Sequence, residues 1–160
     1  MHNLQPHRTR ATRGNAIVET ALTLLPFMAL FLAIVDFNLF IFVRNTMQHA
    51  VREGVRYAVT YQTASGMGHD ASIKSVVQAN AVGFLNGTSG LSKITITYYR
   101  PSDLAVVAQN SPGNIIEVKV DDYRWTWISK WFTPAATASI TVASYDRMEA
   151  LPTGGTPPAR

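Results

Sequence analysis

The sequence has no cysteine among its 160 residues, and only 15% of them are charged. Without cysteine there is no disulfide framework, no thiolate nucleophile and no thiolate metal site. The four histidines are scattered, and no spacing places two of them on one face to bind a metal. No phosphate motif and no convergent catalytic set is present either. We therefore predict a protein without enzymatic activity, metal or cofactor.

The positive charge is too scattered for a nucleic-acid surface. The net charge of +4 is divided between the N-terminal arm, the following helix and isolated later positions. No basic face is interleaved with aromatic side chains, as nucleic-acid binding would require. These cations are expected to contact anionic lipid headgroups, and nucleic acid is not an expected partner.

The deficit of charge is concentrated in one apolar run, residues 21–43. As a helix its length of about 35 Å exceeds a hydrocarbon core of about 30 Å. One aspartate costs less than the many Leu, Ile, Phe and Val side chains gain on insertion. We therefore predict a single membrane span, for which the alternative is a buried core helix. Its polar members are Thr23, Asp36 and Asn38.

Asp36 is the polar residue of this run that most needs an explanation. An ionisable group at membrane depth is costly and is by default a candidate functional residue. Two interpretations stay open: Asp36 faces a partner, or it reaches the outer interface or sits neutral beside Asn38.

The helix is expected to continue beyond the membrane. Residues 44–61 contain no proline, and arginines recur along one side of the helix opposite a stripe of small residues. The chain is therefore expected to divide into a basic leader at 1–14, a transmembrane and amphipathic helix at 15–62, an extracytoplasmic domain at 63–150 and a flexible tail at 151–160.

The domain at 63–150 is predicted to be α+β, with one helix packed on an antiparallel sheet of about three strands. The helix is expected to begin at Asp70, as its N-cap, and to end at Asn86, with Gly87 as its stop. Apolar and polar residues alternate in three later segments, which predicts three strands with one apolar face each. These segments are residues 93–99, 116–121 and 138–143.

An aromatic cluster lies between the second and third of these strands. Exposed, it would mark a surface for a partner or a membrane; buried, it would seal the small core. We favour the second interpretation. Its members are Tyr123, Trp125, Trp127, Trp131 and Phe132.

Two segments beside the apolar run resemble motifs of a known family. Residues 13–19, RGNAIVE, combine a basic leader ending in Gly14 with Glu19 at the fifth position after it. This resembles the prepilin-peptidase site of tight-adherence pilins. Residues 51–58, VREGVRYA, resemble the arginine-rich signature that follows the membrane helix in TadE-like pseudopilins. The signature residues are Arg52, Glu53, Gly54, Arg56 and Tyr57.

The resemblance implies a minor pilin or pseudopilin of a bacterial tight-adherence (Flp) pilus system, which is related to type IV pili and type II secretion. It implies cleavage between Gly14 and Asn15 by a prepilin peptidase, and pairing of Glu19 with the new amine of a neighbouring subunit. One departure is Thr20, where the family usually has Phe or Tyr.

The same resemblance implies the partners and the location of the chain. The expected partners are other pilin subunits, the prepilin peptidase, the inner-membrane assembly platform and membrane lipid. The short basic arm favours an N-terminus in the cytoplasm and a domain outside it. The alternative is an unprocessed, single-pass anchored accessory protein of the cell envelope.

Overall fold

The computed structural model describes residues 11–129, 137–152 and 155–160, with side chains from residue 15 onward. The chain divides into two compact units, which are treated separately below. Of the described residues, the first unit contains 11–38 and 127–129, and the second contains 39–126, 137–152 and 155–160.

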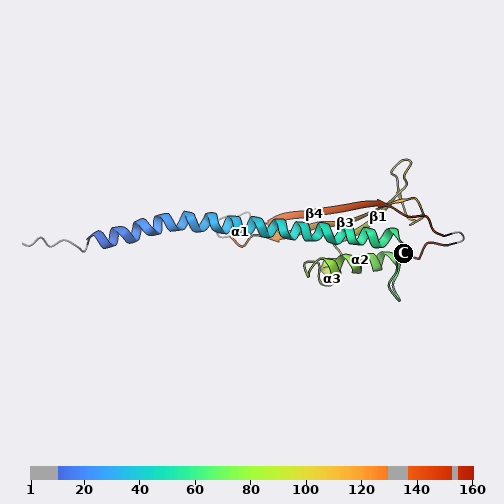
Figure 1. Cartoon of the computed structure of the whole chain (residues 1–160), viewed down its shortest axis with the longest axis horizontal. Helices are drawn as coiled ribbons and strands as arrows, with labels where there is room; N and C mark the ends of the chain where they lie inside the picture. Colours follow the sequence, from blue (N-terminus) through green and yellow to red (C-terminus); the bar gives the residue numbers. More distant parts are fainter. Residues whose placement is uncertain (1–10, 130–136, 153–154) are drawn as a thin grey trace, which may run out of the picture. The chain divides into compact units, whose positions relative to one another are not determined.

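Helix α1 (Ala11–Val59) is the long N-terminal helix that the sequence predicts (Figure 1). Pro26 lies inside it without ending it, since an internal proline removes only one backbone hydrogen bond. The helix is long and apolar enough to cross a membrane over residues 15–59.

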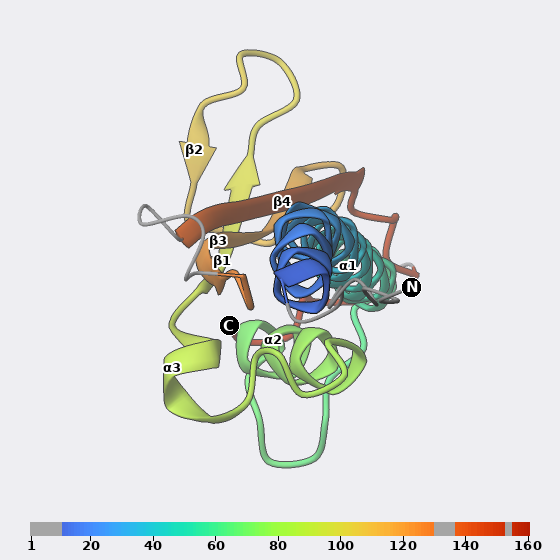
Figure 2. The same cartoon turned by 90° about the vertical axis from the view of Figure 1, so that its left-hand side faces the viewer.

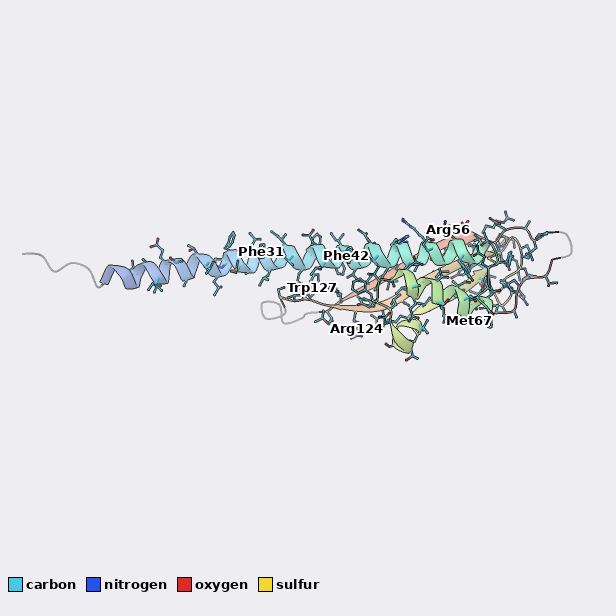
Figure 3. All side chains as sticks on the ribbon, turned by 60° about the horizontal axis from the view of Figure 1, so that its bottom comes forward. Phe31, Phe42, Arg56, Met67, Arg124 and Trp127 are labelled. Atoms are coloured by element: carbon cyan, nitrogen blue, oxygen red, sulfur yellow. The ribbon has the colours of Figure 1, made fainter. Side chains whose placement is uncertain are left out.

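In the first unit, the apolar side chains of α1 point outward. Phe31, labelled in Figure 3, is one of them. Only 6% of the 18-residue window of this helix that qualifies as a membrane span is buried. A core helix of a soluble protein would bury this window, so that alternative is wrong and the segment fits a single-pass membrane anchor. The side chains, each at least 40% exposed, are Ile17, Val18, Leu22, Leu24, Leu25, Phe27, Met28, Leu30, Phe31, Ile34 and Phe37.

The second unit is built on an antiparallel sheet of four strands in the order β2-β1-β3-β4. The register places Ile94 opposite Val120, and Val120 opposite Val142; all three side chains are buried. The α+β prediction is confirmed, with one strand more than expected. The strands are β1 (Ile94–Tyr99), β2 (Val106–Val107), β3 (Ile115–Thr126) and β4 (Thr137–Arg147).

A β-bulge carries β3 beyond the predicted end at residue 121. The register shifts between Val120 and Tyr123, and Asp122 has a positive φ of 46°. An extra residue reverses which side chains face the core, so Tyr123 and Trp125 follow Val120 onto the buried face and pack against the core. The interpretation of the aromatic cluster as a core seal is confirmed for these two residues. Trp131 and Phe132 lie outside the described residues.

Two helical segments cover one face of the sheet. In Figures 1 and 2, the part of α1 beyond residue 39 lies between β4 and α2 (His69–Asn80). The amide Nε2 of Gln48 donates to the carbonyl of Ala143 at 3.1 Å and so ties α1 to β4. The helices and the sheet bury one apolar core, which includes Met47, Val51, Ile73, Val77, Ile116 and Val118.

The second helix differs from the prediction at both ends: it begins earlier and ends earlier than expected. It begins at His69 with Gly68 as the N-cap, so Asp70 lies in the first turn and not at the cap. Left-handed backbone at Val82 and Gly83 (φ 50° and 86°) prevents the helix from continuing to Asn86. Gly87, which was expected to stop it, begins the short helix α3 (Gly87–Leu91).

Candidate functional site

The bond between Gly14 and Asn15, where cleavage is expected, lies inside α1. Helix α1 is described from Ala11 onward, so the backbone on both sides of this bond is helical. A peptidase that requires extended backbone would have to open this part of the helix.

Three polar side chains in and beside the apolar run bond to their own helix. The hydroxyl of Thr20 donates to the carbonyl of Ala16 at 2.8 Å, and that of Thr23 to the carbonyl of Glu19 at 3.1 Å. Asn38 donates from Nδ2 to the carbonyl of Ile34 at 2.7 Å. These bonds to the preceding turn satisfy the polar groups locally, as a helix in lipid requires.

Asp36 is satisfied by backbone from a distant part of the sequence within the first unit. Its Oδ1 accepts the N–H of Ile128 and its Oδ2 accepts the N–H of Ser129, both at 2.8 Å. The side chain is only 2% exposed. Two N–H donors are a favourable environment for a carboxylate. Asp36 therefore holds the turn that follows β3 against α1.

Glu19 differs from Asp36 because no side chain among the described residues donates to its carboxylate. Its side chain is exposed among apolar neighbours on α1. None of the described side chains forms a hydrogen bond or an ion pair with its carboxylate. Of the two acids described between residues 15 and 38, Asp36 therefore has partners among the described residues and Glu19 has none.

Gly54, in the family signature, is where α1 crosses α2 and the sheet. A β-carbon at this position would lie 2.5 Å from Cγ2 of Val77, and 3.6 Å from side-chain atoms of Ile73 and Val118. Distances below 3.0 Å require a neighbour to move. Glycine therefore permits this close approach of helix to helix.

The other signature residues lie at the surface of the second unit. Arg52 is exposed, and Arg56 forms an ion pair with Glu53 at 2.6 Å. Glu53, Arg56 and Tyr57 line an open hollow that continues to Thr60, Gln62 and Val76. Figure 3 labels Arg56 on α1. Gly54 thus lies in the core, whereas the other four signature residues reach the surface.

A buried polar cluster surrounds His69, one of the four histidines whose scattered positions predicted no site. His69 has no exposed surface. Its Nδ1 lies 3.2 Å from Nδ2 of Asn110 and 3.3 Å from the hydroxyl of Tyr98, which itself donates to Asp70 at 2.8 Å. The ring of Tyr61 stacks on the imidazole with centroids 5.9 Å apart.

Burial disfavours the charged form of the His69 imidazole. Since the Asn110 amide is a donor, Nδ1 is the acceptor and Nε2 carries the proton. Nε2 has no partner within hydrogen-bonding geometry among the described residues, although the Ala58 carbonyl is close enough to favour protonation. Burial lowers the pKa of His69 below its ordinary value of 6.5, against the opposing attraction of Asp70. Burial and Asp70 also raise the pKa of Tyr98.

The described part of the chain contains no group of three His, Asp or Glu side chains that could hold a metal ion.

Comparisons with known proteins give one match. No curated protein and no solved structure matches the chain. The family model described as TadE-like protein matches residues 14–56, which include Gly14, Glu19 and the signature from Arg52 to Arg56. The match confirms the predicted resemblance for residues 14–56, which are similar to the TadE-like family.

Proposed function

We propose that the chain is a minor pilin or pseudopilin of a tight-adherence pilus system, processed between Gly14 and Asn15 by a prepilin peptidase. It is anchored in the inner membrane by the first part of α1, with residues 1–14 in the cytoplasm and the second unit outside. Its partners are other pilin subunits, the inner-membrane assembly platform and lipid.

The observation that carries this proposal is the environment of Glu19. The carboxylate is exposed on the apolar part of α1, and no described residue pairs with it. An unpaired carboxylate in lipid is expensive. Cleavage after Gly14 creates a cationic amine on Asn15, one helical turn from Glu19. In an assembly, the amine of one subunit pairs with Glu19 of the next, so that association neutralises both groups.

The runner-up is a permanently anchored envelope protein that is never cleaved. The observation in its favour is that the Gly14–Asn15 bond lies inside α1 and not in an extended segment. The two proposals differ in the N-terminal residue of the membrane-extracted chain, which mass spectrometry identifies.

The test uses three variants in cells that carry a prepilin peptidase. Gly14→Val should leave the chain at full length, because a branched side chain obstructs the peptidase. Glu19→Ala should still be cleaved but should not enter a larger assembly, as judged by co-sedimentation with sheared pili. Glu19→Asp keeps the charge on a shorter side chain and should be intermediate. A wild-type chain that retains residues 1–14 in these cells would establish the runner-up instead.

A further inference from the structure

The surface beside the His69 cluster is occupied by a distant segment of the same chain. Residues 158–160, which follow the last strand, lie along the start of α2. The N–H of His69 donates to the carbonyl of Ala159 at 2.7 Å. Asn110 Nδ2, which also faces His69, donates to the carbonyl of Pro158 at 3.0 Å. Two consecutive main-chain carbonyls of the segment are thus held by donors from two separate parts of the fold.

The side chain of Arg160 is held on three sides. Its guanidinium donates to Oδ2 of Asp70 from Nε at 2.9 Å and from Nη2 at 2.7 Å. Nη1 donates to the carbonyl of Ala108. The guanidinium carbon lies 4.7 Å from the ring centroid of Tyr98. A carboxylate, a carbonyl and an aromatic face together select an arginine, since a lysine ammonium cannot make the same set of directed bonds.

The receiving residues are also held by contacts to one another. Tyr98 is fully buried, and its hydroxyl donates to Oδ1 of Asp70, which leaves Oδ2 for the guanidinium. Asn110 is 6% exposed and is held by His69. Gly68 lets the backbone of Arg160 approach, since a β-carbon there would lie 2.7 Å from its carbonyl group. Contacts of this kind, made among the receiving residues themselves, lower the cost of binding a peptide.

We propose that His69, Asp70, Tyr98 and Asn110 form a binding site for an extended peptide that contains arginine, and that residues 158–160 are its ligand within the folded chain. The segment fastens α2 to the connection that follows β2. This site is separate from Glu19 and the cleavage bond, and the inference does not rest on the proposed function.

The test measures binding of a labelled, amidated peptide of residues 151–160, LPTGGTPPAR, by fluorescence anisotropy. The receptor is the full chain in lipid nanodiscs, or the same chain lacking residues 155–160. The shortened chain should bind the peptide saturably. The full chain should bind it at least tenfold more weakly, because its own segment fills the site. Equal binding by the two chains, or no saturable binding by a shortened chain that unfolds cooperatively, would overturn the proposal.

A second comparison tests the arginine contact itself. A peptide with Arg160→Ala should bind the shortened chain at least tenfold more weakly than the original peptide. Adding Asp70→Asn to the receptor should remove most of this difference. Asp103→Asn is the matched control, because Asp103 pairs with Arg100 and not with Arg160; it should leave the difference intact. An Asp70→Asn receptor that still prefers the arginine peptide would contradict the assignment.

If the shortened chain does not fold, a full-length Arg160→Ala chain takes its place. Its own segment is weakened while the receiving residues are unchanged, so it should bind the arginine peptide more tightly than the full wild-type chain does. The same affinity for both full-length chains would overturn the proposal.

Discussion

A single glycine near the C-terminal end of α1, Gly54, is required by the packing around it. Glycine costs about 1 kcal/mol relative to alanine in a helix interior, so a core helix tolerates it only where something is gained. At Gly54 the gain is the close approach of Val77 and the sheet. The signature residue Gly54 therefore contributes to packing of the core. Its neighbours Glu53 and Arg56 form an ion pair at the surface.

Gly54→Ala is expected to destabilise the second unit although alanine is the better helix former. The new methyl group would lie 2.5 Å from Cγ2 of Val77, whose branched side chain cannot easily turn away in a helix. Overpacking of this kind costs about 1–3 kcal/mol. Urea unfolding of the full chain in detergent, followed by tryptophan fluorescence, measures the loss.

A double-mutant cycle identifies the cause of that loss. Val77→Ala makes room for the new methyl group, so the double variant should lose less free energy of unfolding than the sum of the single variants, by at least about 0.5 kcal/mol. Asn45→Ala, on the exposed side of α1, is the control and should change stability by less than about 0.5 kcal/mol. Additive effects of the Gly54 and Val77 changes would show that this contact is not the reason for glycine.

Among the elements of the first unit, α1 is joined to the turn at 127–129 by one carboxylate. Asp36 accepts two backbone N–H groups of that turn. Hydrogen bonds to a charged group are each worth about 1.5–3 kcal/mol, which is enough to order a short turn. A charge in an apolar run thus has an internal structural role.

Asp36→Ala should release the turn. The amides of Ile128 and Ser129 lose their acceptors, so their hydrogen exchange should accelerate by about tenfold or more, because 1.4 kcal/mol corresponds to a factor of 10. Asp36→Asn keeps one acceptor oxygen and should be intermediate. Asn38→Ala removes only a bond within α1 and should leave both amides unchanged. Hydrogen exchange followed by mass spectrometry in nanodiscs measures this, and unchanged protection in Asp36→Ala would refute the role.

The elements that the sequence predicts well are those whose pattern is long and regular. The apolar run and the alternating cores of β1, β3 and β4 were identified, whereas β2 has only two residues and no period to detect. The bulge at Asp122 reversed the alternation, so the second half of β3 was not recognised as strand. The alternation in residues 116–121 also placed Glu117 on the polar face of its strand, yet its side chain is only 8% exposed. The hydroxyls of Tyr99 and Tyr145 on the neighbouring strands cover its carboxylate and donate to it at 2.6 Å each.

The contacts of the candidate sites were less predictable than the residues themselves. Gly54 and Asp36 stood out in the sequence, but their partners lie far along the chain and only the fold brings them together. The segment at 151–160 has a composition typical of a mobile tail, and nothing in that composition predicts the pairing of Arg160 with Asp70. The only sequence feature that points to this cluster is a histidine followed by an acid, His69 and Asp70. This pair of residues is too common in proteins to predict a site by itself.

At the scale of the whole molecule, the proposed topology follows from one span and a basic arm. The absence of cysteine makes single-cysteine labelling unambiguous. Ser102→Cys, at an exposed position in the second unit, should react with a membrane-impermeant maleimide in intact spheroplasts. Gln5→Cys, in cells without prepilin peptidase so that the arm is retained, should react only after permeabilisation. The opposite result in intact spheroplasts, labelling of Gln5→Cys but not of Ser102→Cys, would mean that the chain is inserted in the opposite orientation. Glu19 would then lie near the outer face of the membrane and could not pair with the amine of a processed neighbour.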